Sequence, residues 1–173
     1  MKTSYYANLR NLDLTKNVPV AISGDEGKLA GFEGKGMRKL SPYPFFKIWK
    51  AREVEIERAF ERGKIDFAEY AKLKEENQND YIQKFYEKVL KPQDPAQVFE
   101  ELGENAVLVC FEKPTEFCHR FLVASWLEMS LGVKIEEAGF EREAKVQENK
   151  QNLKQKLQTV MEKDRVRNQQ GKE

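Results

Sequence analysis

The sequence predicts an α/β protein with a small, mainly parallel, Rossmann-like sheet, a helical block between its strands and a C-terminal helical tail. Short apolar runs rich in β-branched residues lie near both ends of residues 1–139. Between them, residues 41–102 repeat their apolar side chains at helical spacing. We therefore expect an α/β domain over residues 1–139 and a charged helical or partly disordered tail over residues 140–173.

Four segments are predicted to be strands. Lys2–Tyr6 is a short first candidate, and Val18–Ser23 is a clearer second because a proline is tolerated where a strand begins. Ala106–Phe111 is apolar throughout, which is typical of a strand that is covered on both faces. Val133–Glu136 is the last candidate.

Capping residues mark the helix boundaries between residues 41 and 102. Gly63 ends the first helical pattern, since glycine favours the backbone conformation that follows a helix. Asp66 and Glu69 resemble a capping box at the start of the second helix. The pair Asp94–Pro95 then opens a short helix that ends at Gly103.

The helix predicted over residues 117–131 is apolar almost all round, so it belongs in the interior. Thr115 is expected as its N-cap. Its polar side chains cluster in the first turn, where Cys118, His119 and Arg120 follow one another. In an α/β fold this turn lies at the carboxyl end of a strand, where open sheets bind ligands. We therefore expect the functional site there.

This first turn favours two kinds of chemistry. The helix dipole and free N–H groups lower the pKa of a thiol, so Cys118 is a candidate thiolate with His119 beside it. The same groups bind phosphate or carboxylate, with Arg120 as a two-pronged donor and Glu112 as its partner. Because adjacent helix residues point about 100° apart, one of the three is expected to be structural. A third interpretation, in which Cys118 is a small buried apolar residue, stays open.

The candidate residues fall into two groups. Catalytic candidates are Cys118, His119 and Glu112, and ligand-binding candidates are Arg120, Ser4, Tyr5 and Ser23. No metal is expected, because structural zinc takes four ligands and the chain has two cysteines and one histidine without CxxC-type spacing. Cys110 is assigned a packing role. No cofactor is expected either: the glycine-rich segment 23–40 matches neither the dinucleotide nor the P-loop pattern, which favours a surface loop over a phosphate site.

The charge pattern differs between body and tail. The 30 basic and 29 acidic residues nearly cancel. From residue 141 onward, however, nine basic residues face six acidic ones, which hints at an anionic partner for the tail. This tail lacks aromatic residues after Phe140, so we expect a solvated helix that is dispensable for folding. The absence of an apolar signal segment and of a membrane-length apolar run predicts a cytoplasmic protein with free thiols.

The segment Val107–Leu127, VLVCFEKPTEFCHRFLVASWL, resembles the signature of domain-of-unknown-function family 488, a family of bacterial and phage proteins. Blocks in the same order lie upstream, TSYYANLRNL from Thr3, VPVAIS from Val18 and LSP from Leu40. The resemblance thus covers most of the chain from Met1 to about Glu137. It implies a compact α/β fold whose motif residues line a cleft, and it implies no established reaction.

These patterns predict a pocket around Cys118, His119 and Arg120 that binds an anion, either a nucleotide or a nucleic-acid phosphate. They do not decide whether the protein is an enzyme. The alternative is a non-enzymatic binding protein in which the motif is structural and the tail engages a protein partner.

Overall fold

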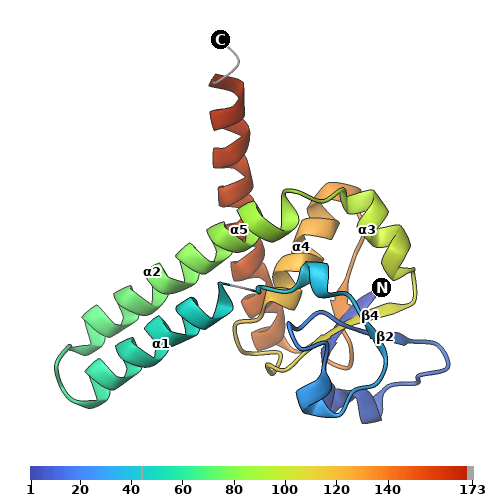
Figure 1. The fold of residues 1–173 in the computed structure, drawn as a ribbon, viewed down its shortest axis with the longest axis horizontal. Coiled ribbons are helices and arrows are strands. Elements are labelled where there is room, and N and C mark those ends of the chain that lie inside the picture. The colour runs from blue at the N-terminus through green and yellow to red at the C-terminus, as the bar shows by residue number, and fades with distance from the viewer. Residues whose placement is uncertain (44, 171–173) are drawn as a thin grey trace.

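The computed structural model describes residues 1–43 and 45–170. It has an α/β fold around a five-stranded, all-parallel sheet of order β3-β2-β4-β1-β5, so the predicted fold class is confirmed (Figure 1). The strands are β1 (Lys2–Tyr5), β2 (Val18–Ala21), β3 (Lys35–Gly36), β4 (Ala106–Cys110) and β5 (Glu136–Glu137).

Helices occupy most of the remaining chain. The α-helices are α1 (Phe46–Glu61), α2 (Phe67–Phe85), α3 (Pro95–Leu102), α4 (His119–Leu131) and α5 (Ala144–Gln170). A π-helical turn, η4 (Tyr86–Leu90), follows α2, and short 3-10 helices are η1 (Tyr6–Asn11), η2 (Lys28–Ala30) and η3 (Arg38–Leu40). Two predicted caps are confirmed, because Asp66 accepts from the Glu69 N–H and Asp94 accepts from the Gln97 N–H.

Strand β3 was not predicted. It lies within the glycine-rich segment and pairs with β2, Val20 opposite Lys35 and Ala21 opposite Gly36. Lysine and glycine are depleted in strands, so composition hides a pairing that rests on backbone hydrogen bonds alone. The last strand, β5, begins at Glu136, where the predicted one ends.

The prediction of Thr115 as the N-cap of α4 was wrong. The helix begins at His119, and Cys118 is its N-cap in an extended conformation. The Asn149 side chain on α5 donates to the carbonyls of Pro114 and Glu116, so these carbonyls are held by tertiary contacts. The helix therefore begins only after this loop, at His119.

The sheet is covered on both faces. One face carries the large core, which includes Val20, Leu108 and most of the apolar residues of α4. The other face carries a small cluster of Ala21, Val107 and Val109. The partly buried residues packed against this cluster are Tyr6, Leu9, Leu12 and Phe32. Burial on both faces explains why β4 reads as a continuous apolar run.

Helix α5 is not simply a solvated tail, and that expectation was wrong. Val146, Leu153, Leu157 and Met161 are buried along one side of it. Their few apolar side chains share one face, which a low overall hydropathy conceals. Asp164 still pairs with Lys91, and the C-terminal end of the helix projects away from the body (Figure 1). The division of the chain after residue 139 stays a prediction, and the predicted fraying toward Glu173 lies outside the described residues.

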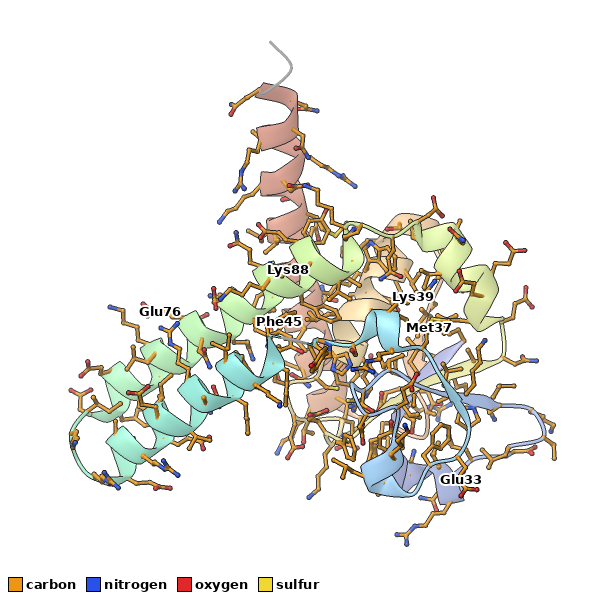
Figure 2. All side chains as sticks on the ribbon, viewed as in Figure 1. Glu33, Met37, Lys39, Phe45, Glu76 and Lys88 are labelled. Atoms are coloured by element: carbon orange, nitrogen blue, oxygen red, sulfur yellow. The ribbon has the colours of Figure 1, made fainter. Side chains whose placement is uncertain are left out.

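Helices α1 and α2 form an antiparallel hairpin that extends away from the sheet (Figure 1). Phe45 lies where this hairpin joins the body (Figure 2), and its ring packs against those of Tyr81 and Phe85. Lys74 on α2 bridges Glu53 and Glu57 on α1. Within the described ranges, none of the helices combines the length and the apolar character needed to cross a membrane.

Candidate functional site

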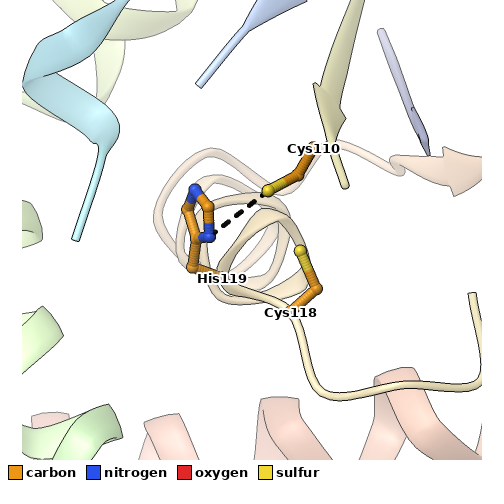
Figure 3. A group of neighbouring side chains, drawn as sticks. All are labelled: Cys110, Cys118 and His119. Carbon is orange, nitrogen blue, oxygen red and sulfur yellow. Dashed lines mark hydrogen bonds between the residues drawn. The ribbon is translucent and has the colours of Figure 1, made fainter. Parts of the chain in front are cut away.

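Three side chains converge between the end of β4 and the start of α4. Cys110 is the last residue of β4, Cys118 caps α4, and His119 is the first residue of α4. Their Sγ and ring nitrogen atoms all lie within 4.8 Å of one another, and Figure 3 shows the side chains meeting in one space. All three are buried, and both cysteines are free thiols, as expected.

The imidazole of His119 has a defined orientation. Its Nε2 lies 2.9 Å from the carbonyl oxygen of Ile22, the residue that follows β2. Since a carbonyl only accepts, Nε2 carries the hydrogen, and the neutral ring presents the lone pair of Nδ1. Nδ1 lies 3.8 Å from Cys110 Sγ (Figure 3). The histidine therefore directs a proton acceptor at the Cys110 thiol.

Cys118 shares a proton with a neighbouring carboxyl group, since its Sγ donates to Glu112 Oε2 at 3.1 Å. Burial opposes ionisation of Cys118, but the Cys110 thiol, the Arg120 charge and His119 outweigh it and lower its pKa well below the ordinary value. Burial, together with the negative charge of Cys118, raises the pKa of Glu112 to about 7. Near neutral pH the shared proton can therefore reside on the carboxyl group and leave a thiolate.

The other two groups of the cluster respond to this thiolate. The Cys118 sulfur and burial raise the pKa of Cys110 well above its ordinary value, so Cys110 stays a thiol. Burial alone would lower the pKa of His119, but the interaction with Cys118 raises it above the ordinary value. Negative charge on Cys118 thus favours the protonated forms of both Cys110 and His119.

Arg120 pairs with a different residue from the one predicted. Its Nε and Nη2 donate to the carboxylate of Glu137 on β5 at 3.3 and 3.1 Å, and both side chains are fully buried. Glu112 contributes only its backbone carbonyl, to Nη1 at 2.7 Å. Because a buried charge must be paired, these bonds make Arg120 a tie between α4 and the sheet edge. Its predicted contact with an anion stays a prediction.

A pocket of about 550 Å³ opens beside the cluster. Four exposed apolar side chains surround it: Leu29, Tyr43, Phe46 and Phe111. Its lining also includes Cys110, Glu112 and His119 from the cluster, and Asp25 and Lys47. The pocket lies at the carboxyl ends of β2 and β4, which is where open α/β sheets bind ligands.

The predicted ligand-binding serines and tyrosine lie in different places. Ser23 lines the pocket, and its hydroxyl bonds to Tyr6 and Asp25. Ser4 is buried in β1 and accepts from the Asn8 side chain. Tyr5 packs its ring against Phe140. The ligand-binding roles of these residues stay predictions.

Sequence reasoning assigned Cys110 to packing, whereas the structure places it at the pocket with His119. The available signal was its position as the last residue of a parallel strand, which is an edge where ligands bind. The Ile22 carbonyl and the Glu137 carboxylate have no such signal, because their roles depend on contacts across the fold.

The fold and the cluster define an α/β protein with a buried thiol–imidazole site at the carboxyl edge of a parallel sheet. Residues 65–131 match the family DUF488-N3a, described as the active DUF488-N3 subclade. The resemblance to family 488 is therefore confirmed over a segment that contains every residue of the cluster. This match does not include the upstream blocks around Ser4 and Ser23. Comparisons with curated proteins and with solved structures give no match.

Proposed function

We propose that the protein is an enzyme that binds a nucleotide, free or within a nucleic acid, and acts on it with the cluster of Cys118, His119 and Glu112. The observation that carries this proposal is the orientation of His119, whose Nδ1 faces the Cys110 thiol in the wall of an open pocket, with the Cys118 sulfur close by. A buried thiol with only a packing role needs no such acceptor. The match to a family subclade described as active supports it.

The pocket lining favours a ligand with a flat apolar part and a charged part. Tyr43, Phe46 and Phe111 offer aromatic surface on which a nucleobase can stack. Lys47 is the cation of the lining that suits a phosphate. In this proposal Arg120 positions the cluster, since its guanidinium is already bonded to Glu137 and Glu112.

The charged groups suit a two-step reaction with a covalent intermediate. The thiolate of Cys118, whose formation His119 and Arg120 favour by lowering its pKa, attacks an electrophilic atom of the ligand and forms a bond from sulfur to that atom. The bond to the leaving group breaks, and the leaving group takes its electron pair together with a proton from Glu112. Water then attacks the intermediate while Glu112 accepts its proton, which restores the thiolate.

Titration of nucleotides and short oligonucleotides tests the ligand assignment. Wild type should bind, and Tyr43→Ala and Lys47→Gln should each weaken binding, the latter with a reduced dependence on salt. Lys145→Gln is the matched control, because Lys145 is an exposed lysine on α5 and the change in charge is the same. Absence of binding by wild type, or equal affinities for all four proteins, would contradict the proposal.

The non-enzymatic alternative has one structural observation in its favour. The end of α5 projects beyond the body, and Val166 there is 52% exposed, which suits contact with a protein partner (Figure 1). In that case the cluster is structural. Two results together would favour this alternative: the double variant Cys118→Ala, His119→Ala binds ligand as wild type does, and wild type itself shows no catalytic activity on that ligand.

A further inference from the structure

We propose that Cys110, Cys118 and His119 form a binding site for a thiophilic divalent cation, with Zn²⁺ as the best-suited ion. The proposal rests on the donor atoms and their arrangement, and it does not depend on which ligand the neighbouring pocket binds. It concerns the same side chains as the proposed function and therefore bears on how that function is controlled.

The separations of the donor atoms fit a tetrahedral ion. Zinc binds thiolate sulfur at roughly 2.3 Å and imidazole nitrogen at roughly 2.0–2.1 Å, so its donors lie roughly 3.5–3.8 Å apart. Cys110 Sγ and His119 Nδ1 are 3.8 Å apart, and all three donors lie within 4.8 Å of one another. An ion can therefore be accommodated by shifts of the sulfur atoms of about 1 Å or less.

The surroundings of the three donors are those of a metal site. His119 Nε2 donates to the Ile22 carbonyl, and metal-binding histidines commonly hold their second nitrogen in this way. Nδ1 is then free to coordinate. The charges also balance, because two thiolates neutralise a divalent ion and the adjacent Arg120 is already neutralised by Glu137. Thiolate ligands thus offset the charge of the ion and reduce the cost of burying it.

The fourth coordination position faces the pocket. Cys110 and His119 both line the pocket, so water or a ligand atom can complete the shell from that side. Zinc sites with three protein ligands and one open position are well suited to two cysteines and a histidine. Ligand count and spacing along the chain argued against zinc, but the fold brings the end of β4 to the start of α4 and assembles three donors.

The metal-bound and the thiolate-reactive forms exclude each other. Binding of the ion displaces the proton of the Cys110 thiol and converts Cys118 from a nucleophile into a ligand. Zinc should consequently suppress the covalent reaction proposed for Cys118 and protect both cysteines from alkylation. The cluster thus gives the protein a reversible, metal-controlled inactive form.

Cobalt titration of the full-length, metal-free protein tests the site. One equivalent of Co²⁺ should produce the visible bands of a tetrahedral ion and a near-ultraviolet thiolate-to-cobalt band, and one equivalent of Zn²⁺ should remove both. Cys110→Ser, Cys118→Ser and His119→Gln should each weaken or abolish these bands. Ser125→Ala is the control, because it changes a buried residue of α4 away from the cluster and should leave the bands intact.

Two further measurements keep the outcome decisive. Circular dichroism shows whether each variant folds, and protection of wild-type cysteines from iodoacetamide by Zn²⁺ requires no variant at all. Absence of tetrahedral bands in wild type, bands that survive all three ligand substitutions, or unprotected cysteines would overturn the proposal. Nucleotide titration of the metal-free protein is a separate readout, so failure of metal binding and failure of the proposed function are distinguishable.

Discussion

At the scale of single residues, the pKa of Cys118 is lowered, as the sequence predicts, but for a different physical reason. The sequence predicts a lowered pKa from a position inside the first turn of a helix. In the structure Cys118 is the N-cap, and its pKa is lowered against burial by the Cys110 thiol, the Arg120 charge and His119. The thiolate is therefore stabilised by neighbouring side chains that only the fold brings close.

Cys118 is expected to react with iodoacetamide before Cys110 in the metal-free protein near pH 7. Access favours Cys110, which lines the pocket, whereas ionisation favours Cys118. Because the thiolate is the nucleophile, we expect ionisation to decide. Mass spectrometry of peptides at short times measures the order, with Cys118→Ser as the control. Faster labelling of Cys110, or labelling of both only after denaturation, would count against the thiolate assignment.

Ser125→Ala is expected to stabilise the protein by about 1 kcal/mol. The Ser125 hydroxyl is fully buried in α4 and has no hydrogen-bond partner among the described residues. Its removal relieves the cost of an unsatisfied polar group and leaves the packing nearly unchanged. Urea unfolding measures the difference, and a clear loss of stability would show that the hydroxyl has a partner after all.

At the scale of elements, ion pairs, one buried and the others partly buried, hold the helices in place. Arg120 joins the start of α4 to β5 through Glu137, and Glu128 near the end of α4 joins α5 through Lys150 and Lys154. The Ile135 N–H also donates to Glu128. Both ends of the central helix are thus joined to other elements by charged side chains, fully buried at Arg120 and partly buried at Glu128.

Arg120→Met is expected to destabilise the fold by roughly 3–5 kcal/mol, because Glu137 is left as a buried, unpaired carboxylate. A second change, Glu137→Gln, should recover part of this loss, since it removes the stranded charge. Urea unfolding of the two single variants and the double variant measures the coupling. Strictly additive losses would show that the two side chains do not act as a pair.

Glu128 is expected to make stability depend on acid pH. Burial raises the pKa of Glu128, but Lys150, the Ile135 N–H and Lys154 outweigh it and leave the pKa below the ordinary value of 4.5. Its contribution is therefore fully present above about pH 4.5 and is lost as pH falls through the lower, folded-state pKa.

Glu128→Gln should accordingly flatten the decline in thermal stability between neutral and acid pH. Glu148→Gln is the matched control, because Glu148 is an exposed carboxylate on α5. Melting curves recorded as a function of pH compare the two variants with wild type. If the decline is the same for all three proteins, the contact between Glu128 and α5 does not contribute to acid sensitivity.

At the scale of the whole molecule, α5 belongs to the core for much of its length. Leu153, Leu157 and Met161 join the main core cluster, and Val146 is buried as well. The sequence predicts a tail that can be removed without loss of folding. The buried face of α5 reverses that expectation, because its removal would expose the apolar side of α4 to water.

A chain that ends at Phe140 is therefore expected to lose its cooperative thermal transition. Each buried apolar side chain of α5 contributes roughly 1.5–3 kcal/mol. Four of them together are comparable with the whole stability of a domain, roughly 5–15 kcal/mol. A chain that ends at Asp164 keeps the four buried residues and the ion pair between Lys91 and Asp164, and it should melt like wild type. Unchanged melting of the shorter chain would restore the interpretation of α5 as dispensable.

Local signals allowed much of the fold to be predicted. Asp66 and Asp94 cap their helices by accepting hydrogen bonds from residues three positions further along the chain. The continuous apolar run of β4 indicates that the strand is buried on both faces. The candidate region was found for the same reason, since a strand end followed by a polar helix start is a local pattern. Periodicity and capping depend on near neighbours in the chain, so the sequence by itself determined the fold class, most elements and the location of the cluster.

Tertiary structure decided how the site is assembled. His119 is oriented by Ile22, which is 97 positions away in the chain, and α4 begins where it does because Asn149 holds the preceding loop. Cys110 becomes a member of the cluster only when β4 and α4 pack together. These contacts join segments whose separation along the chain carries no periodic or capping signal. Tertiary packing therefore determines the hydrogen-bond partners of the cluster, the pKa shifts of its side chains and its position beside the pocket.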